Sequence, residues 1–166
     1  TNPRILQGMK DQDLLAYIQP VFIDLDMNTV EPAIGAQRMD KVYAWKSMLD
    51  MGIHTSGGSD APVVSFDAME NIYFAVTRKN ISGQPQEGWI PSEKISVDEA
   101  VKLFTKNAAY ASYTEDENGT IEVGKNADFV VLEKNIYEID PDEIKATKVD
   151  MTVLGGEIVY EREVEE

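Results

Sequence analysis

The spacing of hydrophobic residues changes near residue 115, and with it the kind of structure that we predict. Before that point, short apolar runs typical of buried strands alternate with runs at three- to four-residue spacing, which are typical of amphipathic helices. A polar stretch at 24–32 is predicted to be a loop. The pattern predicts strands at 18–23 and 53–56 and helices at 38–51 and 67–78.

A further helix is predicted to begin at Ser96 and to continue to Tyr113. Ser96 and Glu99 have the spacing of a capping box, in which two side chains accept hydrogen bonds from backbone N–H groups of the first turn. The pattern then changes to short strands separated by glycine and proline turns, at 120–123, 127–132, 148–153 and 157–160. We therefore predict an α/β part, residues 1–115, followed by an all-β part, residues 116–166.

Composition removes several classes of site. The 166 residues include no cysteine and one histidine, which excludes a disulfide, a thiolate zinc site and any site built from two imidazoles. The formal net charge is −15, and residues 115–166 hold 16 acidic and 5 basic side chains. This excess argues against nucleic acid and anionic membrane as partners, because both bind through Lys and Arg. Neither a signal peptide nor a membrane-length apolar run is present, so we expect a cytoplasmic protein.

The sequence Gly-Gly-Ser-Asp-Ala-Pro at 57–62 is the sharpest local feature. In parallel barrels, reactive groups lie where strands end and loops begin. A carboxylate at Asp60 could there serve as a metal ligand and as a base. The glycines admit a close approach of substrate or backbone. Gly-Ser-Asp is also an ordinary turn, so these residues alone leave both interpretations open.

Other candidates are weaker. His54 is six residues from Asp60, roughly 20 Å in an extended chain, so we interpret it as structural. Residues 114–125 partly resemble a calcium-binding loop, but Thr114 stands at the first ligand position and Lys125 at the twelfth, where carboxylates belong. We predict a turn there. The chain has no Gly-x-Ser-x-Gly elbow and no phosphate-binding glycine motif, which argues against a serine hydrolase.

A series of motifs stands in fixed order over most of residues 17–160. They are GSDAPV at 58–63, AVTR at 75–78, WIP at 89–91, ISVDEA at 95–100, TKNAAY at 105–110, GTIEVGKNADFVVL at 119–132 and TVLGGEIVY at 152–160. Together they resemble the amidohydrolase superfamily, and within it the N-substituted formamide deformylases. The string Gly-x-Ile-x-x-Gly-Lys-x-Ala-Asp is the most specific of these motifs.

The resemblance implies the last strands of a (β/α)₈ barrel at 1–115 and part of a small β-sandwich at 116–166. It implies a metal-dependent hydrolase of non-peptide C–N bonds (amide, formamide or cyclic amide) that acts through water activated by a divalent metal, typically zinc. Asp60 matches the family aspartate that binds the metal and shuttles the proton to the leaving nitrogen. Arg78 and Trp89 fall in candidate loops and could contact substrate; a structural role is the alternative.

The sequence also departs from the family. The family histidines are absent, and Gln7 stands where a ligand histidine would be. We therefore expect a C-terminal fragment that holds no metal and is inactive alone. Its expected partners are the N-terminal remainder of the barrel, a small amide-type substrate and, through open edges, a second copy. The alternative is a degenerate, non-catalytic module with a structural or assembly role.

Overall fold

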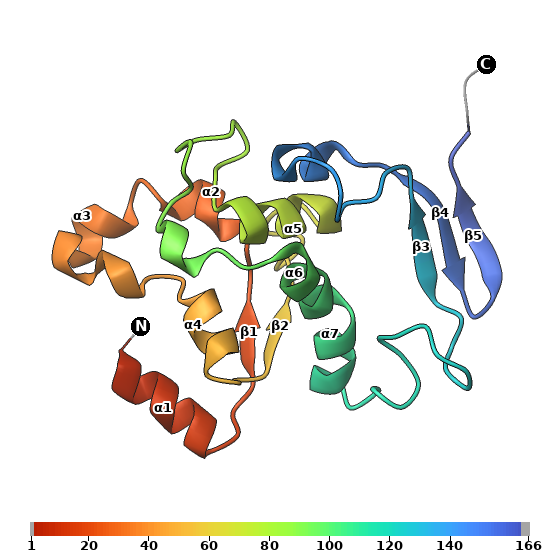
Figure 1. The fold of residues 1–166 in the computed structure, drawn as a ribbon, viewed down its shortest axis with the longest axis horizontal. Helices are drawn as coiled ribbons and strands as arrows, with labels where there is room; N and C mark the ends of the chain where they lie inside the picture. Colours follow the sequence, from red (N-terminus) through yellow and green to blue (C-terminus); the bar gives the residue numbers. More distant parts are fainter. Residues whose placement is uncertain (1, 164–166) are drawn as a thin grey trace.

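The chain forms two sheets of different kinds, one in its N-terminal part and one in its C-terminal part (Figure 1). The structure, a computed structural model, describes residues 2–163, and for Lys41 the backbone only. In order, the elements are α1 (Pro3–Asp11), β1 (Ala16–Ile18), α2 (Phe22–Asp26), α3 (Val30–Ile34), η1 (Ala36–Lys41), α4 (Trp45–Asp50), β2 (Thr55–Gly57), α5 (Ala68–Thr77), η2 (Pro91–Glu93), α6 (Val97–Phe104), α7 (Lys106–Ala111), β3 (Phe129–Leu132), η3 (Pro141–Ala146), β4 (Val149–Leu154) and β5 (Glu157–Glu161).

The first sheet is a parallel pair, in which β1 lies beside β2 with Ala16 opposite Thr55 and Ile18 opposite Gly57. The helices α4, α6 and α7 all contact β2. The second sheet is antiparallel, in the order β3–β4–β5, and each of its two pairings contains one register shift. The α/β fold class expected from the sequence is confirmed at this level.

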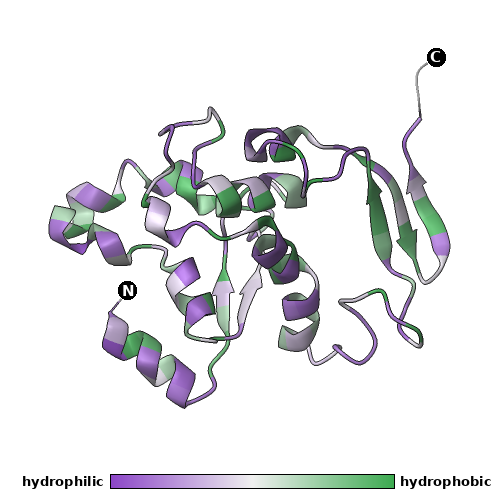
Figure 2. Ribbon diagram, in the orientation of Figure 1, coloured by the Kyte–Doolittle hydropathy of each residue, from purple (hydrophilic) through white to green (hydrophobic). Residues whose placement is uncertain are grey.

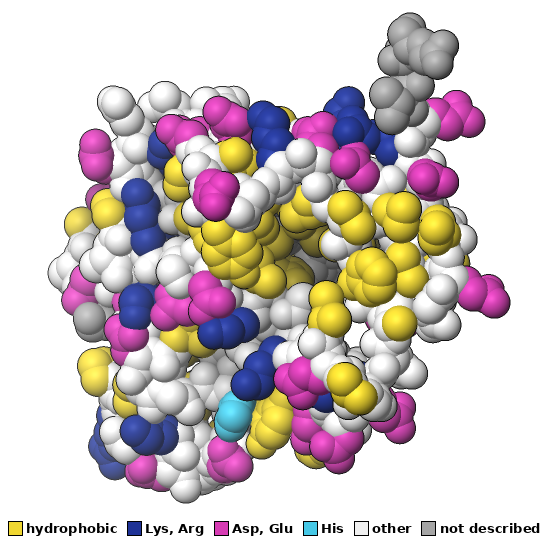
Figure 3. Space-filling view, turned by 45° about the vertical axis from the view of Figure 1, so that its right-hand side comes forward, with side chains coloured by type: hydrophobic (Ala, Val, Ile, Leu, Met, Phe, Trp, Pro, Cys, Tyr) yellow, Lys and Arg dark blue, Asp and Glu magenta, His cyan; other side chains and the backbone are white. Residues whose placement is uncertain are grey.

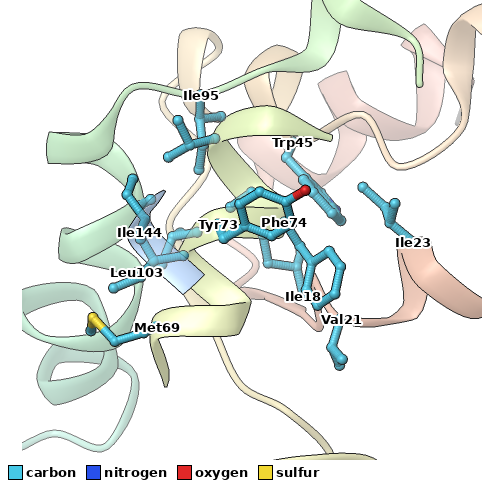
Figure 4. Close-up of a cluster of buried hydrophobic side chains, with 14 of the residues drawn as sticks. Ile18, Val21, Ile23, Trp45, Met69, Tyr73, Phe74, Ile95, Leu103 and Ile144 are labelled. Atoms are coloured by element: carbon cyan, nitrogen blue, oxygen red, sulfur yellow. The ribbon is translucent and has the colours of Figure 1, made fainter. Parts of the chain in front are cut away.

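Helix α5 is the centre of the hydrophobic core. Residues 71–78 are all buried, so the helix is enclosed on every side instead of presenting one apolar stripe. Tyr73 and Phe74 pack against Trp45 and Leu103, and Ile144 of η3 closes the same cluster from the C-terminal part of the chain (Figure 4). Apolar residues of α5 and of the three-stranded sheet stand out in the hydropathy view (Figure 2).

Local signals in the sequence placed two helix starts correctly. The Asp67 carboxylate caps α5 by accepting from the N–H groups of Met69 and Glu70. Ser96 and Glu99 form the predicted capping box at the start of α6. These predictions are confirmed because the capping atoms are all local in sequence.

The prediction of a strand at 18–23 is wrong beyond Ile18, and the prediction of a loop at 24–32 is also wrong. The N–H of Phe22 bonds to the carbonyl of Gln19, and residues 22–26 and 30–34 are helical. Pro20 lacks the N–H that would continue a sheet ladder, so the chain turns there.

Two predicted helices are interrupted. The helix at 38–51 is divided into η1 and α4 by Tyr43, whose φ is +49°. The Tyr43 hydroxyl donates to Asp26, and its ring contacts Trp45 and Trp89, so tertiary contacts override the helical pattern. The helix at 96–113 breaks at Thr105, whose hydroxyl bonds back to the carbonyl of Val101.

The β pattern after residue 115 is confirmed for three of its four strands. Residues 120–123 form no strand, and Ile121 and Val123 are exposed. Glu122 instead begins a turn, its carbonyl accepting from the N–H of Lys125. Within residues 2–163, no helix is both long and apolar enough to cross a membrane.

Candidate active site at the end of strand β2

Asp60 lies three residues beyond the end of β2, in the loop that leads to α5. The pairing of β1 with β2 continues at both ends of the short strands. The N–H of Ala16 bonds to the carbonyl of His54 at 2.8 Å, and the N–H of Gly58 to that of Ile18 at 2.9 Å. Because parallel strands end at the same edge of a sheet, this edge is where the loop bearing Asp60 begins.

The loop holds Asp60 in a tight turn. Its φ is +64°, a left-handed conformation that aspartate tolerates better than most residues. The N–H of Val63 bonds to the Asp60 carbonyl at 3.0 Å, and the N–H of Ala61 bonds to the Ser59 hydroxyl at 3.2 Å. The peptide between Ala61 and Pro62 is cis. These bonds fix the backbone and leave the carboxylate exposed.

Among the side chains that the structure describes, which do not include that of Lys41, the Asp60 carboxylate has no hydrogen-bond or ion-pair partner. An exposed, unpartnered carboxylate on a fixed backbone is suited to bind a divalent cation. In the same range, no three His, Cys, Asp or Glu side chains gather closely enough to hold a metal ion. The donors present therefore fit a single ligand to a metal centre and not a complete centre.

Residues of α6 and α7 support β2 from behind. A Cβ on Gly57 would lie 2.8 Å from the tip of the Phe104 ring, so the small residue is needed for this packing. Asn107 donates its side-chain N–H to the carbonyl of Thr55 at 2.9 Å. Sequence reasoning did not identify Asn107 as a positioning residue, although it lies inside a family-like motif. Its role in positioning β2 is evident only from its hydrogen bond to Thr55, which lies 52 residues away in the sequence.

Arg78 is fully buried at the left-handed C-cap of α5. Its guanidinium carbon lies 4.7 Å from the ring centre of Trp45 and 5.7 Å from that of Trp89. Nε donates to the carbonyl of Trp89 at 2.6 Å and Nη1 to that of Tyr43 at 3.0 Å. Arg78 thus joins three segments of the fold, which is the structural alternative considered for it. Contact with a substrate stays a prediction that this burial does not favour.

The charge of Arg78 is retained in the core. Burial lowers its pKa to about 10, while buried Glu93 and nearby Tyr43 oppose that shift. The guanidinium is therefore protonated at neutral pH. The Glu93 carboxylate accepts hydrogen bonds from the backbone N–H and the hydroxyl of Ser47. Trp89 is half-buried, so part of its surface remains open to solvent.

Gln7 and His54 lie apart from any cluster of ligands. Gln7 is exposed on α1, where its side-chain amide donates to the Asp11 carboxylate at 2.7 Å. His54 is exposed and stacks on Tyr110 with 4.3 Å between ring centres. The described structure therefore brings neither side chain into a group of metal ligands.

Comparison with known proteins places these features in a family context. A model of the amidohydrolase family matches residues 2–160. The chain is 38% identical over 145 residues to a protein of Bacillus subtilis named as an amidohydrolase, YtcJ, an alignment that covers 87% of this chain and 27% of that protein. It is 35% identical over 122 residues to the N-substituted formamide deformylase of Arthrobacter pascens, covering 74% and 22%. The chain thus spans about a quarter of the length of these relatives.

A solved structure agrees at the level of fold. The crystal structure of a metal-dependent hydrolase from Pyrococcus horikoshii matches with a TM-score of 0.75 and 20% identity, covering 85% of this chain and 28% of that one. At this identity the likeness concerns the fold alone.

Proposed function

The chain belongs to the amidohydrolase family, and on that basis we propose that it forms the C-terminal portion of a metal-dependent hydrolase that breaks C–N bonds. In this proposal, residues 1–115 supply the last strands of a (β/α)₈ barrel and residues 116–166 supply part of a small β-sandwich. The parallel β1–β2 pair supports the first assignment. The antiparallel sheet, with apolar side chains exposed on β3 and β5, supports the second.

The free carboxylate of Asp60 carries the proposal. It stands at the end of a parallel strand, on a backbone fixed by turn hydrogen bonds, in the loop whose sequence Gly-Ser-Asp-Ala-Pro-Val resembles the family motif. Here Gly57 and Asn107 tie β2 to α6 and α7, so the position of the loop is set by the core.

In the whole protein, Asp60 would be one ligand of a divalent metal, with zinc as our expectation. The metal, when bound, would activate a water molecule for attack on the amide, formamide or cyclic amide carbon. The role of Asp60 itself is to orient that water, to accept its proton and to deliver the proton to the leaving nitrogen.

The relatives support a small-molecule substrate of the amide class, since one of them is named for its action on N-substituted formamides. Trp89, which is half-buried, remains a proposed contact for such a substrate. The 166-residue chain alone is proposed to be inactive, because the described residues supply too few ligands for a metal.

The proposal is tested with the full-length polypeptide by comparing Asp60→Asn with Asp67→Asn. Both substitutions remove one carboxylate from the same loop, but an asparagine in place of Asp67 would still cap α5. With N-formyl and N-acyl amines as substrates, we expect Asp60→Asn to lower kcat by about 10²–10⁴-fold. Asp67→Asn should retain most activity. Unchanged turnover in Asp60→Asn would refute the assigned role.

The second candidate is a non-catalytic module with an assembly role. The observation that favours it is the exposed position of Gln7 on α1, where its side-chain amide is bonded to Asp11, together with the absence of a group of metal ligands among the described residues. If no upstream reading frame supplies the missing histidines, this second function replaces the first.

A further inference from the structure

Residues 114–126 connect α7 to the strand β3, and Lys125 holds them together. This segment partly resembles a calcium-binding loop in sequence, with Lys125 in place of the final carboxylate. In the structure its ammonium enters the loop. Nζ lies 2.6 Å from the carbonyl oxygen of Glu115, 2.7 Å from the hydroxyl of Thr120 and 3.4 Å from the carbonyl oxygen of Asn118.

The number and type of these oxygens match an ammonium group. An ammonium group has three N–H donors, and the loop offers three acceptors. Two are backbone carbonyls and one is a hydroxyl, so all three acceptors are neutral oxygens. The Lys125 side chain is 17% exposed, whereas Glu122, whose carboxylate lies 4.0 Å away, is 63% exposed. The neutral oxygens, not a surface ion pair, therefore define the site.

The loop also packs against α7. Gly119 has a φ of +89°, and a Cβ there would lie 2.7 Å from the Cβ of Ala109 in α7. The N–H of Asn126 bonds to the carbonyl of Glu117 at 2.9 Å and closes the loop. Inside this frame, the ammonium of Lys125 links the half of the loop that packs on α7 to the half that leads to β3.

We propose that residues 114–126 form a cation-binding loop whose cation is the tethered ammonium of Lys125, and that a free ammonium ion occupies the same oxygens when this side chain is shortened. The site lies outside the loop that carries Asp60. It fixes where the chain enters β3 and, through that, the start of the three-stranded sheet.

The test is amide hydrogen exchange on the full-length polypeptide with Lys125→Ala. The exchange of the Asn126 N–H should become about tenfold faster, since the loop loses its central hydrogen bonds. Adding about 0.2 M ammonium chloride should restore most of the protection, while tetramethylammonium chloride at equal ionic strength should not. Lys102→Ala is the matched control, because Lys102 is exposed and its ion pair with Asp98 lies within α6.

Equal effects of the two variants, or equal rescue by both salts, would overturn the proposal. If Lys125→Ala does not fold, Thr120→Val removes one acceptor while leaving the lysine in place. It should increase exchange at Asn126 severalfold, and unchanged exchange there would also contradict the proposal.

Discussion

Helix α5 and strand β5 are both rich in apolar residues, yet they lie in opposite surroundings. Residues 71–78 of the helix region are all buried, whereas every residue of β5 is exposed. The difference arises because α5 is enclosed by β1, α4, α6 and η3, while the three-stranded sheet contributes Leu132 of β3, which is only partly buried, to the same cluster. A hollow of about 350 Å³ separates Met69 of α5 from Tyr160 of β5.

The surface view agrees with this contrast. Hydrophobic side chains gather on both sides of a central hollow on this face, and one of these groups lies over the half that carries the three-stranded sheet (Figure 3). Phe129, Val131, Ile158 and Val159 are among those exposed. A small sheet whose outer strands are mostly exposed and whose central strand β4 is mostly only half-buried contributes little stability by itself. An apolar pattern therefore determines the type of element, and the remainder of the fold determines whether the element is buried.

The largest expected difference between the core around α5 and the three-stranded sheet is in the loss of stability when an apolar side chain is truncated. Leu103→Ala should lower the free energy of unfolding by about 2–5 kcal/mol, because Leu103 is fully buried in the cluster around α5 and its truncation leaves a cavity. Ile158→Ala, on a side chain that is 57% exposed, should change it by about 0.5 kcal/mol or less. Urea unfolding of both variants measures the difference. Similar losses would mean that the sheet is as well packed as the core.

Two glycines with positive φ offer a second contrast. A Cβ on Gly88 would lie 2.3 Å from the Thr77 carbonyl oxygen, whereas one on Gly155, in the turn between β4 and β5, would meet nothing within 4 Å. Gly88→Ala should therefore cost about 3 kcal/mol, from backbone strain and overpacking together. Gly155→Ala should cost only the strain, about 1 kcal/mol. Denaturation midpoints check this order, and a reversed order would contradict the close packing of Gly88.

A smaller, pH-dependent effect is expected at Tyr43. Burial, and then its hydrogen bond to Asp26, raises the pKa of Tyr43 above the usual 10.0. Above about pH 10, the folded state therefore keeps a proton on Tyr43 that the unfolded state loses. The stability that protonated Tyr43 gives to the folded state is complete below about pH 10 and declines as the pH rises further. The stability difference between the wild type and Tyr43→Phe should narrow between pH 9 and about pH 11. Tyr160→Phe, on the exposed sheet, is the control. A stability difference between the wild type and Tyr43→Phe that widens as the pH rises would contradict the expected direction.

Local signals predicted much of the fold, and long-range contacts explain the rest. The caps at Asp67 and Ser96 depend on neighbours within three residues, so the sequence contains the information. The break at Tyr43 depends on Asp26, Trp45 and Trp89, which no local pattern reveals.

The candidate site likewise contains residues that local sequence signals identify and residues that only long-range contacts reveal. The place of Asp60 in a loop after a strand could be predicted, because both are read from neighbouring residues, whereas its role as a ligand stays a prediction. The burial of Arg78 could not be predicted, because it results from two tryptophans and two carbonyls brought together by folding. The contact of Asn107 with Thr55 also appears only in three dimensions.

The central claim is that Asp60 is one ligand of a metal centre completed by residues outside this chain. The most direct measurement is metal content by mass spectrometry after dialysis against micromolar zinc. We predict stoichiometric metal in the full-length polypeptide, a marked loss of metal in its Asp60→Asn variant, and none in the 166-residue chain. One zinc per chain bound by the 166 residues alone, or full metal retention in Asp60→Asn, would contradict the claim.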